Sequence, residues 1–569
     1  MFRLADEYVA HMLRAHPELA TQLGMHDRDS ELVPVSQALL DAERAWIADL
    51  DDRLSACGGR DGAGLSLAGR LERGALAARI RRQRLDLESL RPLQNDPGAC
   101  LPQVEGAIRP LLERRGGSPC LRFGSVARRL EQVPEVMRAA KVNLASASRL
   151  ATEEAIVRWG DMLDVLRVDL PAAARPCRDP ATQARLSEAD SAAVHAMVDY
   201  VDFLREDVAS RARDSFALGG VACARLLLGD GVGAELASVG ETQSSRPPLG
   251  ADAVQARLDS LLDRGREELA RTRARMESLA VLIAPSGRIR AALDSLAADR
   301  PPDTAVVQHV EAELAAIRAF LGERRIVTLP ARARVSVREV PLRAGELSPA
   351  RLDAQGVWER GGGEAWLSLM DLASDGEATP PHPGRALSAR EALTLAAFRE
   401  ALPGRYLAFL ARQGAPSRFR QAFPSADFVE GWASYCETLM PEQGYGGGAR
   451  LELAERAEIA REVGRLLAAI SLHARGMSLA EAAALFREQC FLDSAAAERE
   501  ARLAALDPER SAGTLGRWRI LDLREEARSR LGERFDLRAF HDALLRQSAV
   551  PLPLARSAVL RELGIPEKP

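Results

Sequence analysis

The sequence predicts a mostly helical protein that contains one small β element. Apolar residues recur at helical spacing through most of the chain, as in ALLDAERAWIADLDDRL and LERGALAARIRRQRLDLESL. The period changes to two only near IVTLPARARVSVREVPL, where Val335 and Val337 alternate with polar residues. With 569 residues, 47% of them hydrophobic, the chain is long enough to bury a large core. We therefore expect an all-α, globular architecture with a local β insert.

Proline and glycine clusters divide this helical pattern. The segment SSRPPLGAD, around Ser244 to Gly250, is the most plausible seam, so we expect an N-terminal helical lobe over 1–245 and a C-terminal lobe over 246–569. The β insert is expected at about 326–370, where WERGGGEAWLSLMDL offers a second strand. Helices return from about 388, and Ser478 and Asp536 are typical helix-start residues.

Charge argues against several classes of partner. A net charge of −4 gives no basic excess for nucleic acid or for an anionic membrane surface. Lys141 and Lys568 are the only lysines, and we attribute this arginine bias to genome composition. No apolar stretch approaches the roughly 20 residues of a membrane span. The first residues form an amphipathic pattern and not a secretory signal, so we expect no membrane association.

The cysteine pattern predicts a reducing environment. The seven cysteines are widely scattered and never form a C-x-x-C pair, which argues against a disulfide framework and a zinc knuckle. A cytoplasmic location is therefore expected. The cysteines are Cys57, Cys100, Cys120, Cys177, Cys223, Cys436 and Cys490.

The informative stretch begins with Arg399-Glu400-Ala401-Leu402-Pro403-Gly404-Arg405 and continues to Glu430-Gly431-Trp432-Ala433. It resembles the active-site region of the bacterial family called domain of unknown function 885, whose members look like helical zinc peptidases of the thimet-oligopeptidase type. The family pattern is His-Glu-x-x-Pro-Gly-His, followed by a Glu-Gly-Trp-Ala helix. Segments such as EYVAHMLRAHPELATQLGMHD, FLGERRIVTLP and SLHARGMSLAEA are also similar to the family. The resemblance implies a two-lobed, peptidase-like ellipsoid with a deep central cleft and degenerate active-site helices at about 388–475.

Both histidines of that pattern are arginines in this chain. A guanidinium stays protonated and offers only donors, so Arg399 and Arg405 are not metal ligands. Of the ligand set that the resemblance implies, only Glu430 is present, and Glu400 matches the general base that would activate a metal-bound water. We therefore predict no catalytic metal and no cofactor.

Further departures follow downstream. Ala469-Ile470-Ser471-Leu472-His473 stands where the family has roughly Asp-Thr-Gly-Ile-His, and Gly513-Thr514 stands where the family has a Tyr-Lys pair suited to an oxyanion. The resemblance thus leaves Glu400 and His473 as vestigial catalytic positions.

Two arginines bring two positive charges to the place where a dication would sit, and buried Glu400 and Glu430 would need cationic partners. A salt-bridge cluster in place of the metal is one hypothesis. The alternatives are solvated arginines left by drift, and an anion site for a carboxylate or phosphate. Arg399, Arg405 and Glu430 are accordingly the candidate ligand-binding residues.

Three functions remain open. The first is a pseudo-peptidase whose cleft binds a peptide, a small anionic molecule or a protein partner. The second is an enzyme repurposed to metal-free chemistry, for instance in a biosynthetic pathway. Its acid, base or electrostatic groups would be Glu400, Glu430, Arg399, Arg405 or His473. The third is an active zinc peptidase with a different ligand set, for which His382 is the nearest histidine. Whether the chain is an enzyme is undecided, and Cys436 fits a buried packing residue better than a nucleophile.

Overall fold

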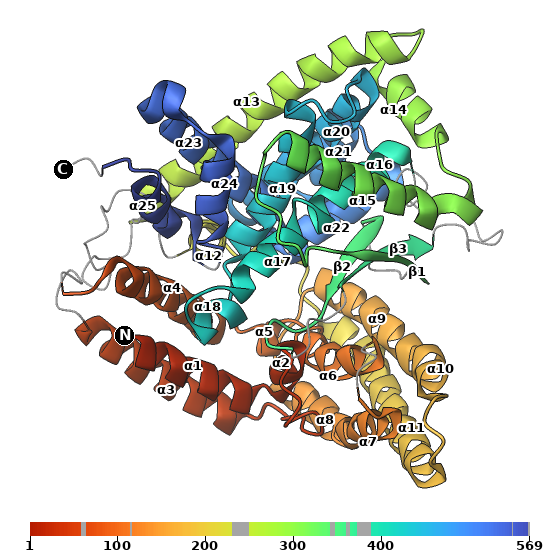
Figure 1. Ribbon diagram of the computed structural model, residues 1–569. Helices are drawn as coiled ribbons and strands as arrows, with labels where there is room; N and C mark the ends of the chain where they lie inside the picture. Colours follow the sequence, from red (N-terminus) through yellow and green to blue (C-terminus); the bar gives the residue numbers. More distant parts are fainter. Residues whose placement is uncertain are drawn as a thin grey trace.

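Amphipathic helices form most of the first 228 residues, as the sequence pattern predicts (Figure 1). The computed structural model describes residues 1–57, 64–113, 117–229, 250–341, 348–359, 365–371, 389–548 and 550–566. The expected seam at 245/246 and His382 lie outside these residues. The helices of the first part are α1 (Phe2–Ala15), α2 (Pro17–Gln22), α3 (Gln37–Ala56), α4 (Leu67–Arg84), α5 (Pro92–Asn95), α6 (Leu101–Glu113), α7 (Pro119–Leu130), α8 (Val133–Asn143), α9 (Arg149–Asp164), α10 (Leu170–Ala174), α11 (Pro180–Phe203) and α12 (Gly220–Leu228).

The second part is also helical apart from one small sheet. Ser478 and Asp536 accept backbone hydrogen bonds at the starts of two of its helices, which confirms both as N-caps. The elements are α13 (Ala251–Ile283), α14 (Ile289–Ala298), α15 (Val306–Glu323), β1 (Ser336–Pro341), β2 (Ala350–Ala354), β3 (Ala365–Asp371), α16 (Arg390–Ala396), α17 (Arg405–Gln413), α18 (Arg418–Ala422), α19 (Ala426–Glu442), α20 (Ala449–Ala474), α21 (Leu479–Gln489), α22 (Ser494–Leu506), α23 (Ala512–Leu531), α24 (Leu537–Leu545) and α25 (Leu552–Glu562).

The expected β insert is present. Its strand order is β1-β3-β2, with β1 parallel and β2 antiparallel to β3. Two strands lie in the segments that the alternating pattern indicates, whereas β2 was not predicted. Leu367 and Leu369 of β3 are buried in the core that the sheet shares with α15 to α17, α19 and α23 to α25. The sheet thus packs against the candidate site helices.

The helices form two groups in Figure 1, with α1 to α11 on one side of the sheet and most of α13 to α25 on the other. One core lies within α6 to α11, and another joins α12 to α14 with α20 to α22. A further core packs α1 to α4 against α18 and α25, so the first helices share a core with the C-terminal half. None of the described helices combines the length and hydropathy needed to cross a bilayer.

One cysteine prediction is wrong. Cys120, in α7, and Cys177, which precedes α11, form a disulfide although they are 57 residues apart in sequence. Packing of α7 against α11 brings their Cα atoms to 4.7 Å, a separation that no sequence spacing reveals. The other five cysteines are free, and Cys436 is fully buried, as expected for a packing residue.

Two glycines allow α19 and α23 to cross at unusually short range. A Cβ added at Gly431 would lie 2.4 Å from the Cα of Gly516, and one added at Gly516 would lie 2.1 Å from the backbone oxygen of Asp427. Backbone atoms cannot move aside as a flexible side chain can. The contact between these two helices therefore requires glycine at both positions.

We predict that Gly431→Ala lowers the free energy of unfolding by about 1–3 kcal/mol, the usual cost of overpacking a core. Urea denaturation followed by circular dichroism measures this change. Gly160→Ala in α9 is the matched control, because a Cβ there meets no neighbouring atom within 4 Å. The control should stabilise the helix slightly. Equal stabilities of Gly431→Ala and the unmodified protein would contradict the prediction.

Candidate functional site

The arginine motif lies in a sharp turn between two helices. Arg399 and Glu400 belong to a π-helical turn, η8 (Ala397–Ala401), that continues α16, and Arg405 begins α17. Between them, Leu402–Pro403 is a cis peptide bond. A Cβ added at Gly404 would lie 2.0 Å from the backbone oxygen of Arg399, so only glycine fits there. The turn returns the chain on itself and places Arg405 beside Glu400.

Trp432 fixes this turn to α19. Its indole Nε1 donates a hydrogen bond to the backbone oxygen of Pro403 at 2.8 Å, and the side chain is completely buried. Tyr435, one turn later, is also buried, and its hydroxyl contacts His541 Nε2 at 2.8 Å. Both aromatic residues are core anchors, and they position α19 so that Glu430 faces the turn.

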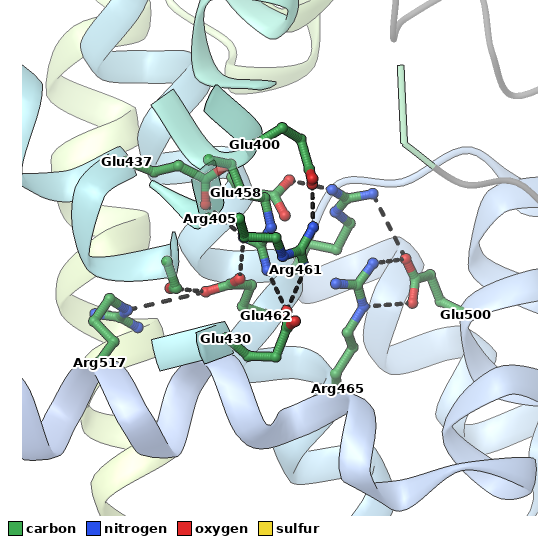
Figure 2. Close-up of polar contacts among 12 residues, drawn as sticks. Glu400, Arg405, Glu430, Glu437, Glu458, Arg461, Glu462, Arg465, Glu500 and Arg517 are labelled. Atoms are coloured by element: carbon green, nitrogen blue, oxygen red, sulfur yellow. Dashed lines mark hydrogen bonds and ion pairs between the residues drawn. The ribbon is translucent and has the colours of Figure 1, made fainter. Parts of the chain in front are cut away.

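Arg405 connects the two retained carboxylates. Its Nη1 pairs with Glu400 and its Nη2 pairs with Glu430 (Figure 2). Glu400 is 2% exposed, and its Oε2 also accepts a hydrogen bond from the backbone N–H of Leu352 in β2 at 3.2 Å. The β insert therefore contacts the site directly. The cationic partner that Glu400 and Glu430 were expected to need is present.

Arg399 binds a second set of carboxylates. Its Nη1 lies 2.6 Å from Glu437 Oε2 and 2.7 Å from Glu462 Oε1, while its Nη2 lies 3.7 Å from Glu430 Oε2. Glu430 is thus shared between the two arginines. Both guanidiniums therefore have acidic partners, as the salt-bridge hypothesis predicts. We call these six residues the ion-pair cluster: Arg399, Glu400, Arg405, Glu430, Glu437 and Glu462.

Further polar residues surround the ion-pair cluster. Glu462 accepts a hydrogen bond from the Ser434 hydroxyl and lies 4.0 Å from Arg517, whose Nη1 donates to Glu268 of α13 at 2.7 Å. Figure 2 also shows a neighbouring group on α20 and α22, in which Arg465 binds both oxygens of Glu500. Arg461 joins that group through Glu458 and Glu500. Ion pairs and hydrogen bonds therefore connect charged side chains from several helices.

Burial and the arginines shift the pKa values of these carboxyls in opposite directions. Burial, only partly opposed by Arg399, raises the pKa of Glu437 to about 8. Burial also acts on Glu462, but Arg399 and Arg517 outweigh it and lower its pKa to about 2. Burial raises the pKa of Glu400, whereas Arg405 and Arg399 overcome burial and lower that of Glu430. Glu437 and Glu462 share Arg399 and titrate as a pair, and the raised pKa within this pair reduces the excess of negative charge in the cluster.

The residues of this site do not fit a catalytic zinc ion. Arg399 and Arg405 stand at the positions that the resemblance gives to histidine ligands, and a guanidinium has no lone pair to donate. The carboxylates that remain are bound to guanidinium groups. Within the described residues, no group of three or more His, Cys, Asp or Glu side chains is arranged to hold a metal ion.

His473 does not join the cluster. Its Nδ1 accepts a hydrogen bond from the backbone N–H of Leu218 at 3.3 Å, and its Nε2 lies 3.3 Å from the backbone oxygen of Ala504. The ring is 3% exposed, and burial lowers its pKa. A neutral imidazole bonded on both sides to backbone groups holds α20 against its neighbours. It does not converge with Glu400.

Sequence reasoning missed Glu437, Glu462, Ser434 and Arg517. Glu430, Ser434 and Glu437 have the i, i+4, i+7 spacing of one helix face, which was the available signal. Glu462 had no such signal, because it reaches the cluster from another helix. Gly513 lies at the edge of the cluster, where an added Cβ would be 3.2 Å from Glu462 Oε1 and 3.7 Å from Arg399 Nη2.

The family profile described as bacterial protein of unknown function (DUF885) matches residues 17–559. A proposed lipoprotein of unknown function from Shewanella oneidensis has a similar structure, with 21% identity, a TM-score of 0.75, and coverage of 98% of this chain and 99% of that chain. Another from Colwellia psychrerythraea has 16% identity, a TM-score of 0.79 and 99% coverage of both chains. No curated protein is significantly similar in sequence. At these identities the structures support the fold alone.

We predict that Glu462→Gln lowers the free energy of unfolding by about 3–5 kcal/mol, the usual cost of breaking a buried ion pair. The reason is that Glu462 balances Arg399 and Arg517. Glu437→Gln is the matched variant, because an amide imitates the protonated carboxyl that already binds Arg399. It should be at least as stable as the unmodified protein in urea denaturation at pH 7, because the amide removes the cost of protonating this carboxyl on folding. Similar losses in both variants would contradict the unequal ionisation of this pair.

The same two variants give a test by pH. Glu437 has a folded-state pKa of about 8 against an ordinary 4.5, so only the folded state holds this proton between those values. Its contribution to stability is therefore present at low pH and is lost as pH rises towards 8, by up to about 1.4 kcal/mol per pH unit. Glu437→Gln should remove that part of the slope. If Glu437→Gln leaves the slope of unfolding free energy against pH unchanged between pH 6 and 8, the proton is not on Glu437.

Proposed function

Since this chain belongs to the DUF885 family of bacterial proteins of unknown function, we propose that it is a pseudo-peptidase. In this proposal, the ion-pair cluster replaces a catalytic zinc site on a peptidase-like scaffold. The protein keeps this scaffold and uses it to bind a peptide, a small anionic molecule or a protein partner. It does not hydrolyse peptides with zinc.

The observation that carries this proposal is the position of Arg405. One guanidinium neutralises both Glu400 and Glu430, the residues that the resemblance assigns to the general base and to a metal ligand. A dication at that position would neutralise the same carboxylates. Arginine therefore substitutes for the charge of the metal but supplies neither a Lewis acid nor an activated water. The substitution keeps the scaffold stable and removes the chemistry.

The same geometry argues against a metal-free enzyme at this site. A general base must reach its substrate, yet Glu400 is 2% exposed and is held by Arg405 and by the backbone of Leu352. His473, the other vestigial position, is bonded to backbone groups elsewhere. The side chains of Arg405 and Glu430 are 27% and 32% exposed, so they are the part of the cluster that a ligand would meet.

Zinc binding tests the proposal. We expect the purified full-length protein to carry no stoichiometric zinc by elemental analysis and to give no zinc isotherm in calorimetry. The double variant Arg399→His, Arg405→His restores two imidazoles beside Glu430 and should bind zinc. The double variant Arg399→Lys, Arg405→Lys keeps the charges and should not. Stoichiometric zinc in the unmodified protein would overturn the proposal, as would a folded histidine variant that binds none.

The disulfide is evidence on the cellular compartment in which the folded chain resides. The cysteine pattern predicted the cytoplasm, but structural disulfides such as Cys120–Cys177 persist mainly in oxidising compartments. The two similar structures come from proteins described as proposed lipoproteins. As part of this proposal, we place the folded chain in an oxidising compartment.

Thiol labelling of protein from its native host tests this placement. After alkylation without reduction, mass spectrometry of peptides should find Cys120 and Cys177 linked, and the four buried free cysteines should react only after unfolding. The buried Cys223 serves as the internal control for unfolding, because its side chain has no exposed surface. Complete alkylation of Cys120 and Cys177 before reduction would instead support the cytoplasm.

A further inference from the structure

A groove of about 570 Å³ lies between α13 and α21, with α20 as its floor. Both α13 and α21 pack on α20, and the three helices lie next to one another in Figure 1. Leu467 and Ser471 line the groove from the side of α20 that faces away from Glu462. The groove is therefore separate from the ion-pair cluster.

The inner surface of the groove is apolar. Leu262 and Leu269 of α13 and Leu467 of α20 belong to the core that these helices share, and Leu485 and Met477 are partly buried along the other wall. Small-molecule sites usually have this size and consist of apolar walls with a few polar groups that orient the ligand. The polar groups of this groove therefore decide which ligand it fits.

Arg273 reaches from α13 towards the end of α21. Its Nη1 donates a hydrogen bond to Gln489 Oε1 at 3.3 Å, and its guanidinium carbon lies 5.5 Å from the centre of the Phe491 ring. Its Nε lies 3.4 Å from Glu277 Oε1. The Nη2 group of Arg273 and the Nε2 group of Gln489 have no partner among the described residues. Two adjacent side chains thus offer free donors to the groove.

The ion pair of Arg273 with Glu277 leaves this arginine available. The two side chains are 42% and 60% exposed, and a single nitrogen of the guanidinium makes the contact. Exposed pairs of this kind contribute little, because water and salt screen them. By contrast, Arg275 on the same helix binds both oxygens of Glu452, each at 2.7 Å. An anionic ligand can therefore bind Arg273 without breaking a bidentate ion pair.

Positive charge and a free hydroxyl continue along the groove. Arg266 lines it two turns before Arg273, and its contact with Asp263 at 3.1 Å also joins two exposed side chains. The charged residues of the lining are these two arginines and Glu277, so positive charge is in excess. Ser471 also lines the groove, is 8% exposed, and has no partner for its hydroxyl among the described residues. The groove thus combines apolar walls, an excess of positive charge and free donors.

We propose that this groove binds a medium-chain aliphatic carboxylate. The carboxylate accepts hydrogen bonds from Arg273 and Gln489, since a guanidinium matches the geometry of a carboxylate and supplies its counter-charge. The apolar chain lies against Leu269, Leu467 and Leu485. The proposal does not depend on whether the ion-pair cluster replaced a metal.

Calorimetric titration of the full-length protein with sodium octanoate tests the proposal, with octanamide and octylammonium chloride as matched compounds. We expect one octanoate to bind at millimolar concentrations or below, and the other two compounds to bind at least about tenfold more weakly. Arg273→Gln should weaken octanoate binding about tenfold or more, because it removes the charge that binds the carboxylate. Arg271→Gln, at a 69% exposed position of α13 outside the groove, is the matched control and should bind like the unmodified protein.

A second variant guards against a folding defect in Arg273→Gln. Ala274 is exposed and lines the groove next to Arg273, so Ala274→Glu should leave the helix intact and weaken octanoate binding by charge repulsion. Equal binding of octanamide and octanoate would overturn the proposal. So would unchanged octanoate affinity in Arg273→Gln, or no binding of octanoate to the unmodified protein at millimolar concentrations.

Discussion

Neutralisation of buried carboxylates is the constraint on which the centre of this structure depends. Glu400, Glu437 and Glu462 are each 5% exposed or less, and none could remain charged there without a cation. Arg399 and Arg405 supply those cations. Their contacts tie η8, α17, α19 and α20 together, and Arg517 extends the connection to α13. Loss of one charge would leave its partners uncompensated in several elements at once.

Glycine makes such dense packing of charge possible. Gly404 allows the chain to turn back on itself, so that Arg405 reaches Glu400. Gly431 and Gly516 bring α19 and α23 into backbone contact, and Gly513 leaves room beside Arg399 and Glu462. A larger residue at any of these positions would separate the helices or fill the space of a guanidinium. The backbone contacts and the ion pairs therefore depend on each other.

The sequence predicted those features that a local pattern encodes. Helical periodicity, the β insert and the N-caps at Ser478 and Asp536 are local, and the pairing of arginine with Glu400 and Glu430 followed from charge balance. Local patterns could not predict side-chain partners that are distant in the sequence. Glu462 comes from a distant helix, and Cys120 meets Cys177 only because α7 packs on α11. His473 was assigned to the site by resemblance, but its ring is bonded to the backbone elsewhere.

Helix α20 shows two outcomes for a buried glutamate. Glu462 lies within reach of two arginines and a hydroxyl, so it stays ionised and serves only the interior of the protein. Glu455, two turns earlier on α20, has one arginine at close range, with Arg456 Nε 3.1 Å from its Oε2. Burial raises the pKa of Glu455 to about 7, against the opposing effects of Arg456, Arg517 and Thr438. Two close arginines and a hydroxyl therefore keep one buried glutamate ionised, whereas weaker compensation leaves the other close to its neutral form.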